Sequence, residues 1–225
     1  MIYAQENFMA NMESETTDLA RIFMQFGIYR NTLSKAHNDF VKRQLQKDYD
    51  IVTKTYNLQG KTYKGTFRED ACRKLNREAY EKEAKLATVL AALGFDVVLI
   101  EENSAKSGTK PDAIVNGIVM DFKEIKAFYE KDATRNTLGN NYHDGMKKNN
   151  SEGVVLYLHN FSESFVRKNM GFKKTMPGKN GLALFFHEDT GKLQLIDMEK
   201  VRAAQLERPM SSRAPGESAE PSDNY

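Results

Sequence analysis

The stretch Lys110 to Lys126, KPDAIVNGIVMDFKEIK, decides the fold that the sequence predicts. Within it, Asn116-Gly117 stands between two short runs of strand-forming residues. This pattern is typical of a β-hairpin with a two-residue type I′ turn, because both turn residues must adopt positive φ. With that turn, Val115 pairs with Ile118, and the register of the whole hairpin follows by counting outward.

The predicted register places two acidic residues opposite each other on one face of the hairpin. Asp112 lies directly across from Asp121, and Lys123 shares their face. The other face carries Ala113, Val115, Met120 and Phe122. Facing carboxylates repel each other, whereas a divalent cation between them reverses the sign of the interaction. The arrangement suits phosphodiester hydrolysis, since hard oxygen ligands hold Mg²⁺ or a similar ion and the ammonium orients a water or offsets developing charge.

The string Pro111-Asp112, eight further residues, then Asp121-Phe122-Lys123 resembles the PD-(D/E)xK nuclease superfamily. More narrowly, a helix, a strand, a "KPDAIVNG" hairpin and a "DFK" strand resemble the C-terminal toxin (CdiA-CT-like) nuclease domains of contact-dependent growth inhibition systems. The resemblance covers roughly Glu78 to Asp197. It implies a restriction-endonuclease-like core, a substrate of tRNA or DNA inside a competitor cell, and a cognate immunity protein that covers the site. The metal would be Mg²⁺, with Mn²⁺ or Zn²⁺ as alternatives.

A third acidic residue is predicted from the helix that precedes the hairpin. Thr66 to Glu69 has the pattern of a capping box, and Gly94 is a suitable stop, so a helix is expected from about Thr66 to Leu93. Glu83 falls inside the apolar stripe of that helix, and a buried carboxylate needs a cation or lysine nearby. Two interpretations remain open: Glu83 is a further metal ligand, as the superfamily often has on this helix, or it pairs with a neighbouring basic side chain at the surface.

The rest of the chain predicts an α/β (α+β) fold with a mixed sheet of about four to six strands flanked by helices. Residues 1–65 read as an N-terminal helical extension, with one or two amphipathic helices up to about Lys47, a possible break near Gly27 and a short ribbon after them. Residues 66–206 would be the nuclease domain. Residues 207–225 are rich in Ser, Pro and Glu and are expected to be disordered.

Charge and cysteine content limit where such a protein acts and what it binds. The formal net charge is +2, but Arg30 to Lys85 carries 14 Lys or Arg against 8 Asp or Glu, which suits either a phosphate-rich partner or charged helices that are simply solvated. Cys72 is the single cysteine, so no internal disulfide forms. This fits a protein that acts in a reducing cytoplasm, either that of the cell that makes it or that of a target cell.

No apolar stretch of about 20 residues is present for a membrane span, and the first residues do not resemble a signal peptide. Export would then need a larger precursor or a secretion machine. Nucleic-acid contacts are assigned to Lys110, Lys126, Arg135 and His143.

Alternatives remain for the register and for the function. Glu124-Ile125-Lys126 also fits the acidic-x-Lys form, but only a bulge near Phe122 would bring Glu124 to the face of Asp112.

Three functions are considered, and the first is a metal-dependent nuclease. The second is a metal-independent ribonuclease of the barnase, colicin and RelE-like group, which would use His143, Lys123, Arg135 or Thr137. The third is a non-enzymatic nucleic-acid-binding module. His159 and His187 end predicted strands and are interpreted as structural.

Overall fold

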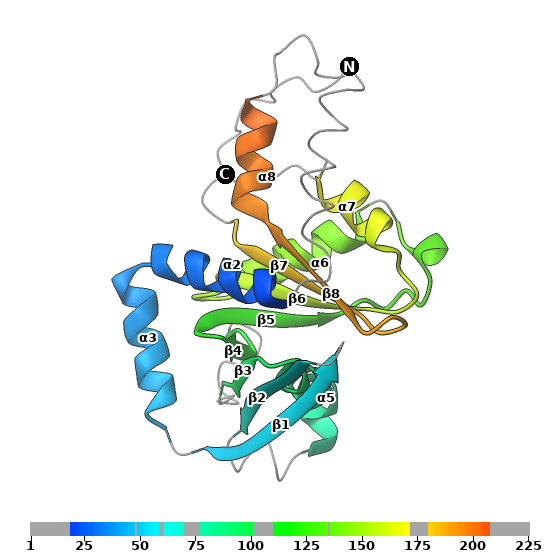
Figure 1. Ribbon diagram of the computed structural model, residues 1–225. Helices are drawn as coiled ribbons and strands as arrows, with labels where there is room; N and C mark the ends of the chain where they lie inside the picture. Colours follow the sequence, from blue (N-terminus) through cyan, green and yellow to red (C-terminus); the bar gives the residue numbers. More distant parts are fainter. Residues whose placement is uncertain are drawn as a thin grey trace.

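The computed structural model describes residues 19–47, 49–58, 61–69, 77–100, 110–134, 136–171 and 180–207. They form a mixed eight-stranded sheet with helices against both faces, and the strands lie side by side in chain order, β1 to β8 (Figure 1). The predicted α/β class with a mixed, helix-flanked sheet is confirmed. The sheet is wider than the four to six strands expected, because the segment before Glu69 adds two long strands to one edge.

The strands are β1 Asp50–Leu58, β2 Lys61–Glu69, β3 Asp96–Leu99, β4 Ala113–Val115, β5 Ile118–Glu124, β6 Gly153–Leu158, β7 Leu182–His187 and β8 Lys192–Asp197. Three neighbouring pairs are parallel, namely β2 with β3, β5 with β6, and β6 with β7. The other pairs are antiparallel. Parallel neighbours need a crossover, and the helices between them supply it.

The helices are α2 Leu19–Thr32, α3 Lys35–Leu45, α5 Glu81–Ala92, α6 Thr137–Met146, α7 Glu163–Gly171 and α8 Met198–Leu206, with 3₁₀ turns at Arg77–Tyr80 and Glu130–Asp132. The two predicted N-terminal helices are present. Their break lies at Ser34 and not at Gly27, because the Ser34 hydroxyl oxygen accepts a hydrogen bond from His37 N at 3.2 Å and caps α3. Figure 1 shows α3 leaving the end of α2 at a steep angle.

The helix predicted from Thr66 to Leu93 does not begin at Thr66, and residues 70–76 lie outside the described residues. Thr66 belongs to β2, where its backbone N–H donates to Phe95 O at 3.1 Å and its hydroxyl donates to Asp96 Oδ1 at 2.6 Å. The side chain that suggested a helix cap therefore ties β2 to the start of β3. The predicted helix end is confirmed, since α5 stops before Gly94, which has a φ of 99°.

Apolar side chains fill three clusters around the sheet. The largest joins α2 and α5 to one face and includes Phe26, Leu90 and Met120. On the opposite face, a second cluster joins α6, α7 and α8 to β6 and β7, and a separate small cluster joins Val41 of α3 to Val119 of β5. The opposite face is therefore covered in two separate parts, and part of β5 lies between them.

The hairpin forms as predicted from Asn116-Gly117. Asn116 has a φ of 47° and Gly117 a φ of 83°, and Val115 pairs with Ile118. The apolar face is also confirmed, since Ala113, Val115, Met120 and Phe122 all belong to the α2–α5 cluster. The β5–β6 ladder continues without interruption to Glu124, so no bulge turns Glu124 toward Asp112. The rival Glu124 register is thus excluded by the strand pairing.

Several predictions concern residues outside the described part of the chain, including Arg135 and the tail from 208 onward. In the described part, no helix combines the length and apolar character that crossing a membrane requires.

Candidate active site

The two predicted carboxylates, of Asp112 and Asp121, meet on the face of the hairpin that lies between α3 and α6. Asp112 immediately precedes β4, and its Oδ2 accepts a hydrogen bond of 2.8 Å from Phe122 N, next to Asp121. Its backbone oxygen accepts a second hydrogen bond, of 2.9 Å, from Ile100 N. Asp112 is therefore held between β3 and β5. Its carboxylate accepts the hydrogen bond from β5 that a backbone carbonyl would accept if the β4–β5 ladder continued.

The electrostatics of this pair are unfavourable as it stands. Asp121 is fully buried, with 0% of its surface exposed. Burial and then the neighbouring Asp121 carboxylate raise the pKa of Asp112 to about 7, against the opposing effects of the Phe122 N–H and Lys123. Neither oxygen of Asp121 accepts a hydrogen bond of acceptable geometry from the described residues. Buried carboxylates that lack hydrogen bonds are costly unless a positive charge lies nearby.

Two lysines supply part of that charge. Lys123 Nζ lies 2.6 Å from Asp121 Oδ2, which confirms the predicted sharing of one face. Lys148, just beyond α6, places its Nζ 4.0 Å from Asp121 Oδ1. Both side chains are largely buried, with 25% and 19% exposed.

The sequence analysis missed Lys148 and the glycine that allows it to approach. A Cβ on Gly145 would lie 2.6 Å from Val154 Cγ2 and 3.1 Å from Asp121 Oδ2, so only glycine lets α6 pack this closely over the acid. Gly145 and Lys148 are three residues apart, on the same side of the helix end. A glycine followed three residues later by a lysine at the end of a helix is the sequence signal that could have identified Gly145 and Lys148.

The prediction of Glu83 as a third ligand of the same ion is wrong. Among the described residues, no group of three or more His, Cys, Asp or Glu side chains could hold a metal ion. The physical reason is the position of α5, whose Leu86 and Leu90 pack with Phe122 on the other face of the sheet. Glu83 is half-buried there, separated from Asp112 and Asp121 by the strands themselves.

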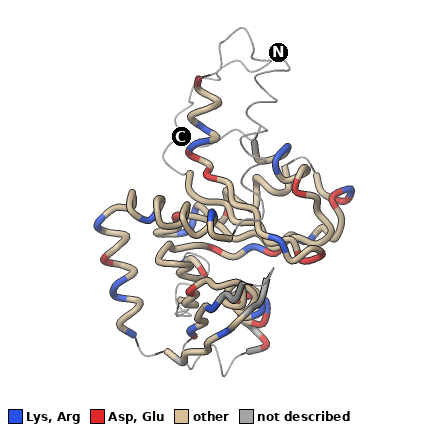
Figure 2. Tube along the Cα trace, viewed as in Figure 1, with Lys and Arg blue, Asp and Glu red and all other residues tan. Residues whose placement is uncertain are grey.

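The other predicted contact residues are scattered around the hairpin. Lys110 is half-buried just before Pro111, and Lys126 is exposed after β5. His143 precedes Gly145 by two residues, which is a rotation of about 200° around α6, so its side chain leaves the helix on the side away from Asp121. Arg135 lies outside the described residues. Figure 2 shows acidic and basic positions interspersed along the described chain.

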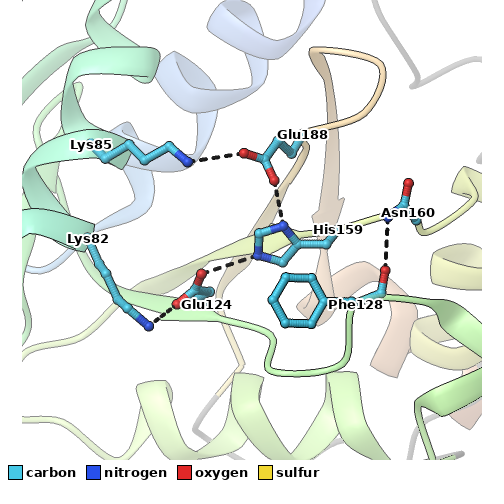
Figure 3. Close-up of polar contacts among 7 residues, drawn as sticks. All are labelled: Lys82, Lys85, Glu124, Phe128, His159, Asn160 and Glu188. Atoms are coloured by element: carbon cyan, nitrogen blue, oxygen red, sulfur yellow. Dashed lines mark hydrogen bonds and ion pairs between the residues drawn. The ribbon is translucent and has the colours of Figure 1, made fainter.

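A second charged cluster lies at the ends of β5, β6 and β7, on the α5 side (Figure 3). His159 is at its centre, with Nε2 3.2 Å from Glu124 Oε1 and Nδ1 2.5 Å from Glu188 Oε2. Lys82 pairs with Glu124, and Lys85 Nζ lies 3.1 Å from Glu188 Oε1. The sequence analysis gave His159 a structural role but did not foresee this cluster, because its members converge only through the β5–β6–β7 register.

The charge pairs of this second cluster shift both acids in the opposite direction from Asp112. A hydrogen bond with Tyr157, then contacts with Lys85 and His159, lower the pKa of Glu188 to about 2. Lys82 and then His159 lower the pKa of Glu124. His187, by contrast, is buried, with Nδ1 2.9 Å from Phe161 O and Nε2 3.3 Å from Gln194 Oε1, as expected for a structural histidine.

Comparisons with known proteins add a partial structural likeness. No protein-family model matches the sequence, and neither does any curated protein. A CdiA-CT/CdiI toxin and immunity complex from Burkholderia pseudomallei contains a chain with a TM-score of 0.37 and 19% identity, covering 55% of this chain and 87% of that one. Overlap at this level transfers no residue role, so the assignment of the site depends on its own geometry.

The residues present fit a hard divalent cation. The site offers the facing carboxylates of Asp112 and Asp121, and the oxygens of Asp121 accept no hydrogen bond from the described residues. In the described chain, no His or Cys side chains join them to form the group of ligands that a tetrahedral zinc site needs. Mg²⁺ is commonly bound through one or two carboxylates, with waters and substrate phosphates as the remaining ligands. The donor set therefore favours Mg²⁺, or Mn²⁺, over Zn²⁺.

Proposed function

We propose that the protein is a metal-dependent nuclease that hydrolyses phosphodiester bonds in tRNA or DNA. The observation that carries the proposal is the buried pair of Asp112 and Asp121: Lys123 and Lys148 both lie against Asp121, and the pKa of Asp112 stays raised to about 7. Burial and the second acid raise the pKa of Asp112, whereas a divalent cation held by both carboxylates would favour their ionised forms.

Each residue of the site then has a separate task. A divalent ion bound by Asp112 and Asp121 would polarise the scissile phosphate and lower the pKa of a bound water. Lys123 holds its ammonium where a water nucleophile or a phosphate oxygen would approach Asp121. Lys148 adds positive charge from the α6 side and offsets negative charge that develops on the phosphate. The cover of α6 over Asp121 limits access of bulk water and strengthens these interactions.

Cleavage assays test the proposal directly. Purified protein is incubated with tRNA and with plasmid DNA, with Mg²⁺ or Mn²⁺ and separately with EDTA. Cleavage that requires the ion, and that returns when excess Mg²⁺ is added to the EDTA sample, is expected. Thermal unfolding gives a readout independent of turnover: Mg²⁺ at about a hundred times its Kd should add about 2.7 kcal/mol of stability, and Asp121→Asn should abolish the shift. Cleavage that persists unchanged in EDTA would overturn metal dependence.

A metal-independent ribonuclease is the second candidate, and the structure offers it less support. Its general acid or base would be His143, whose ring lies against Tyr142 with centroids 5.5 Å apart and leaves α6 away from the carboxylates. Full activity in EDTA with loss in His143→Gln would favour it. Binding of nucleic acid with no cleavage under any condition would favour the third, non-enzymatic, function.

We also propose a biological setting for this activity, based on the resemblance of KPDAIVNG and DFK to growth-inhibition toxin domains. The protein would act in the cytoplasm as an interbacterial or phage-associated toxin effector. A cognate immunity protein would bind over Asp112 and Asp121. Growth arrest on expression, absent in Asp121→Asn, is the expected phenotype.

A further inference from the structure

Two aromatic rings are exposed on the segment that follows β5. Phe128 is 62% exposed and Tyr129 is 50% exposed, whereas most large apolar side chains of the described chain are buried. They lie five and six residues after Lys123 of the proposed active site. Since an extended chain spans at most about 3.6 Å per residue, Phe128 lies within about 25 Å of Asp121. The two rings and Asp121 lie on opposite sides of β5, so a nucleic acid that contacts both must pass around the end of this strand.

The Phe128 ring has a packing partner in the described chain although it is 62% exposed. His159 packs against it, with ring centroids 4.9 Å apart, and His159 is itself fixed between Glu124 and Glu188 (Figure 3). The backbone of Phe128 is anchored as well, because its carbonyl accepts a hydrogen bond of 3.1 Å from Asn160 Nδ2. The charged cluster at the strand ends thus supports the ring from beneath and leaves much of its surface open to solvent.

Tyr129 borders a cavity of about 510 Å³ beside this ring. Its walls include the carboxylates of Glu130, Glu163 and Asp189 and the neutral polar groups of Asn160 and Thr190. The acids disfavour a phosphate inside the cavity, whereas a flat, uncharged group with hydrogen-bonding edges suits it. Lys131 lies at the rim, with Nζ 5.3 Å from the Tyr129 ring centroid, and supplies a positive charge for a phosphate outside.

We propose that Phe128 and Tyr129 form a base-stacking platform that binds an unpaired nucleobase of the substrate. This inference rests on the proposed function and narrows its substrate to single-stranded or looped nucleic acid. Bases stacked in a duplex cannot reach such rings, whereas splayed bases stack on aromatic side chains regardless of sequence. The nearby Lys126 and Lys131 fit the phosphates on either side of that base, which favours a nucleic acid over a protein partner.

A direct test uses the complete chain carrying Asp121→Asn, which is expected to bind nucleic acid without cutting it. The sequence has no tryptophan, so a Phe128→Trp variant carries the only indole, and its fluorescence reports on the platform alone. A single-stranded oligonucleotide should change that fluorescence on binding, and the same sequence as a blunt duplex should not. Base–aromatic stacking of about 1–3 kcal/mol means that Phe128→Leu should weaken single-strand binding about fivefold to a hundredfold. The matched control is Leu206→Ala at the exposed end of α8, which should bind as tightly as the parent.

The outcomes separate this inference from the nuclease assignment. Single-strand binding that is unchanged in Phe128→Leu, equal fluorescence changes with duplex, or no binding of single strands would each overturn the platform, even if the unmodified protein cleaves nucleic acid. Single-strand binding that depends on Phe128, in a protein that cuts nothing, would support the platform and overturn the nuclease. Circular dichroism of Phe128→Leu and Phe128→Trp confirms that any change is not due to unfolding.

Discussion

Strand β5 separates two charged clusters that differ in how their acids are balanced. On the α6 side, Asp121 is fully buried beside Asp112, and burial with mutual repulsion raises the pKa of Asp112 to about 7. On the α5 side, Glu124 and Glu188 share the two ring nitrogens of His159, and Lys85 and Tyr157 help lower the pKa of Glu188 to about 2. In the first cluster both lysines lie against Asp121 and the pKa of Asp112 is raised, whereas in the second cluster the pKa values of both acids are lowered.

This difference is what we expect if the first cluster binds a ligand and the second supports the fold. A balanced, partly exposed ion-pair network stabilises its surroundings modestly and gains little from an added ion. A buried acid pair that repels itself destabilises the free protein and is retained where binding compensates. Both clusters use alternate side chains of one strand, so the period of two in β5 sets which acid belongs to which task.

The difference between the two clusters predicts that the largest effect of a substitution is on the rate of cleavage. Asp121→Asn removes a proposed ligand while keeping size and shape, so cleavage should fall by more than about a hundredfold. Glu124→Gln removes an acid on the opposite face of the same strand and should lower cleavage by less than about tenfold, through its support of His159. Initial rates on one labelled substrate at saturating Mg²⁺ measure both. Similar losses in the two variants would show that the faces do not have separate roles.

The effect of Asp112 on stability should be intermediate in size and depend on pH. Its folded pKa of about 7 lies above the ordinary 3.8, so the unfolded chain ionises first as the pH rises. Ionisation of Asp112 therefore lowers the free energy of unfolding as the pH rises from about 4 to about 7. Above that range the free energy of unfolding stays at the lower value with respect to this group. Asp112→Asn, which cannot ionise, should be more stable than the parent near pH 8, by at most about 4 kcal/mol, and equal to it near pH 4.

Urea unfolding in EDTA at both pH values measures this difference. Asp144→Asn is the control, because Asp144 is an exposed acid paired to Lys147 and should show no such gain. A destabilised Asp112→Asn near pH 8 would mean that the carboxylate supports the fold and that the site is not deficient in positive charge.

Much of the hairpin could be predicted from sequence because local rules determine it. Asn116-Gly117 fixed the turn, the turn fixed the register, and the register correctly placed Lys123 beside Asp121. The stop of the preceding helix at Gly94 was also correct. Strict periodicity and turn residues determine these features without reference to distant parts of the chain.

The errors came from features that depend on tertiary pairing. Thr66 to Glu69 matched a helix cap, but pairing with β1 and β3 made this segment a strand. Glu83 has the right periodicity to face inward, yet periodicity does not show which face of the sheet its helix covers. Lys148 and Glu188 reach their clusters through helix crossovers, and no local pattern contains that information.

The smallest predicted effect concerns Glu188, on the balanced side of β5. Its folded pKa of about 2 lies below the ordinary 4.5, so its contribution is present above about pH 4.5 and is lost as the pH falls toward 2. Because the side chain is 39% exposed, solvent screening keeps that contribution small. Glu188→Gln should therefore destabilise the protein by only about 0.5 kcal/mol near pH 7, and the difference should vanish near pH 2. Thermal midpoints across this range measure it, and a gain in stability near pH 7 would show that this cluster, too, has unbalanced charge.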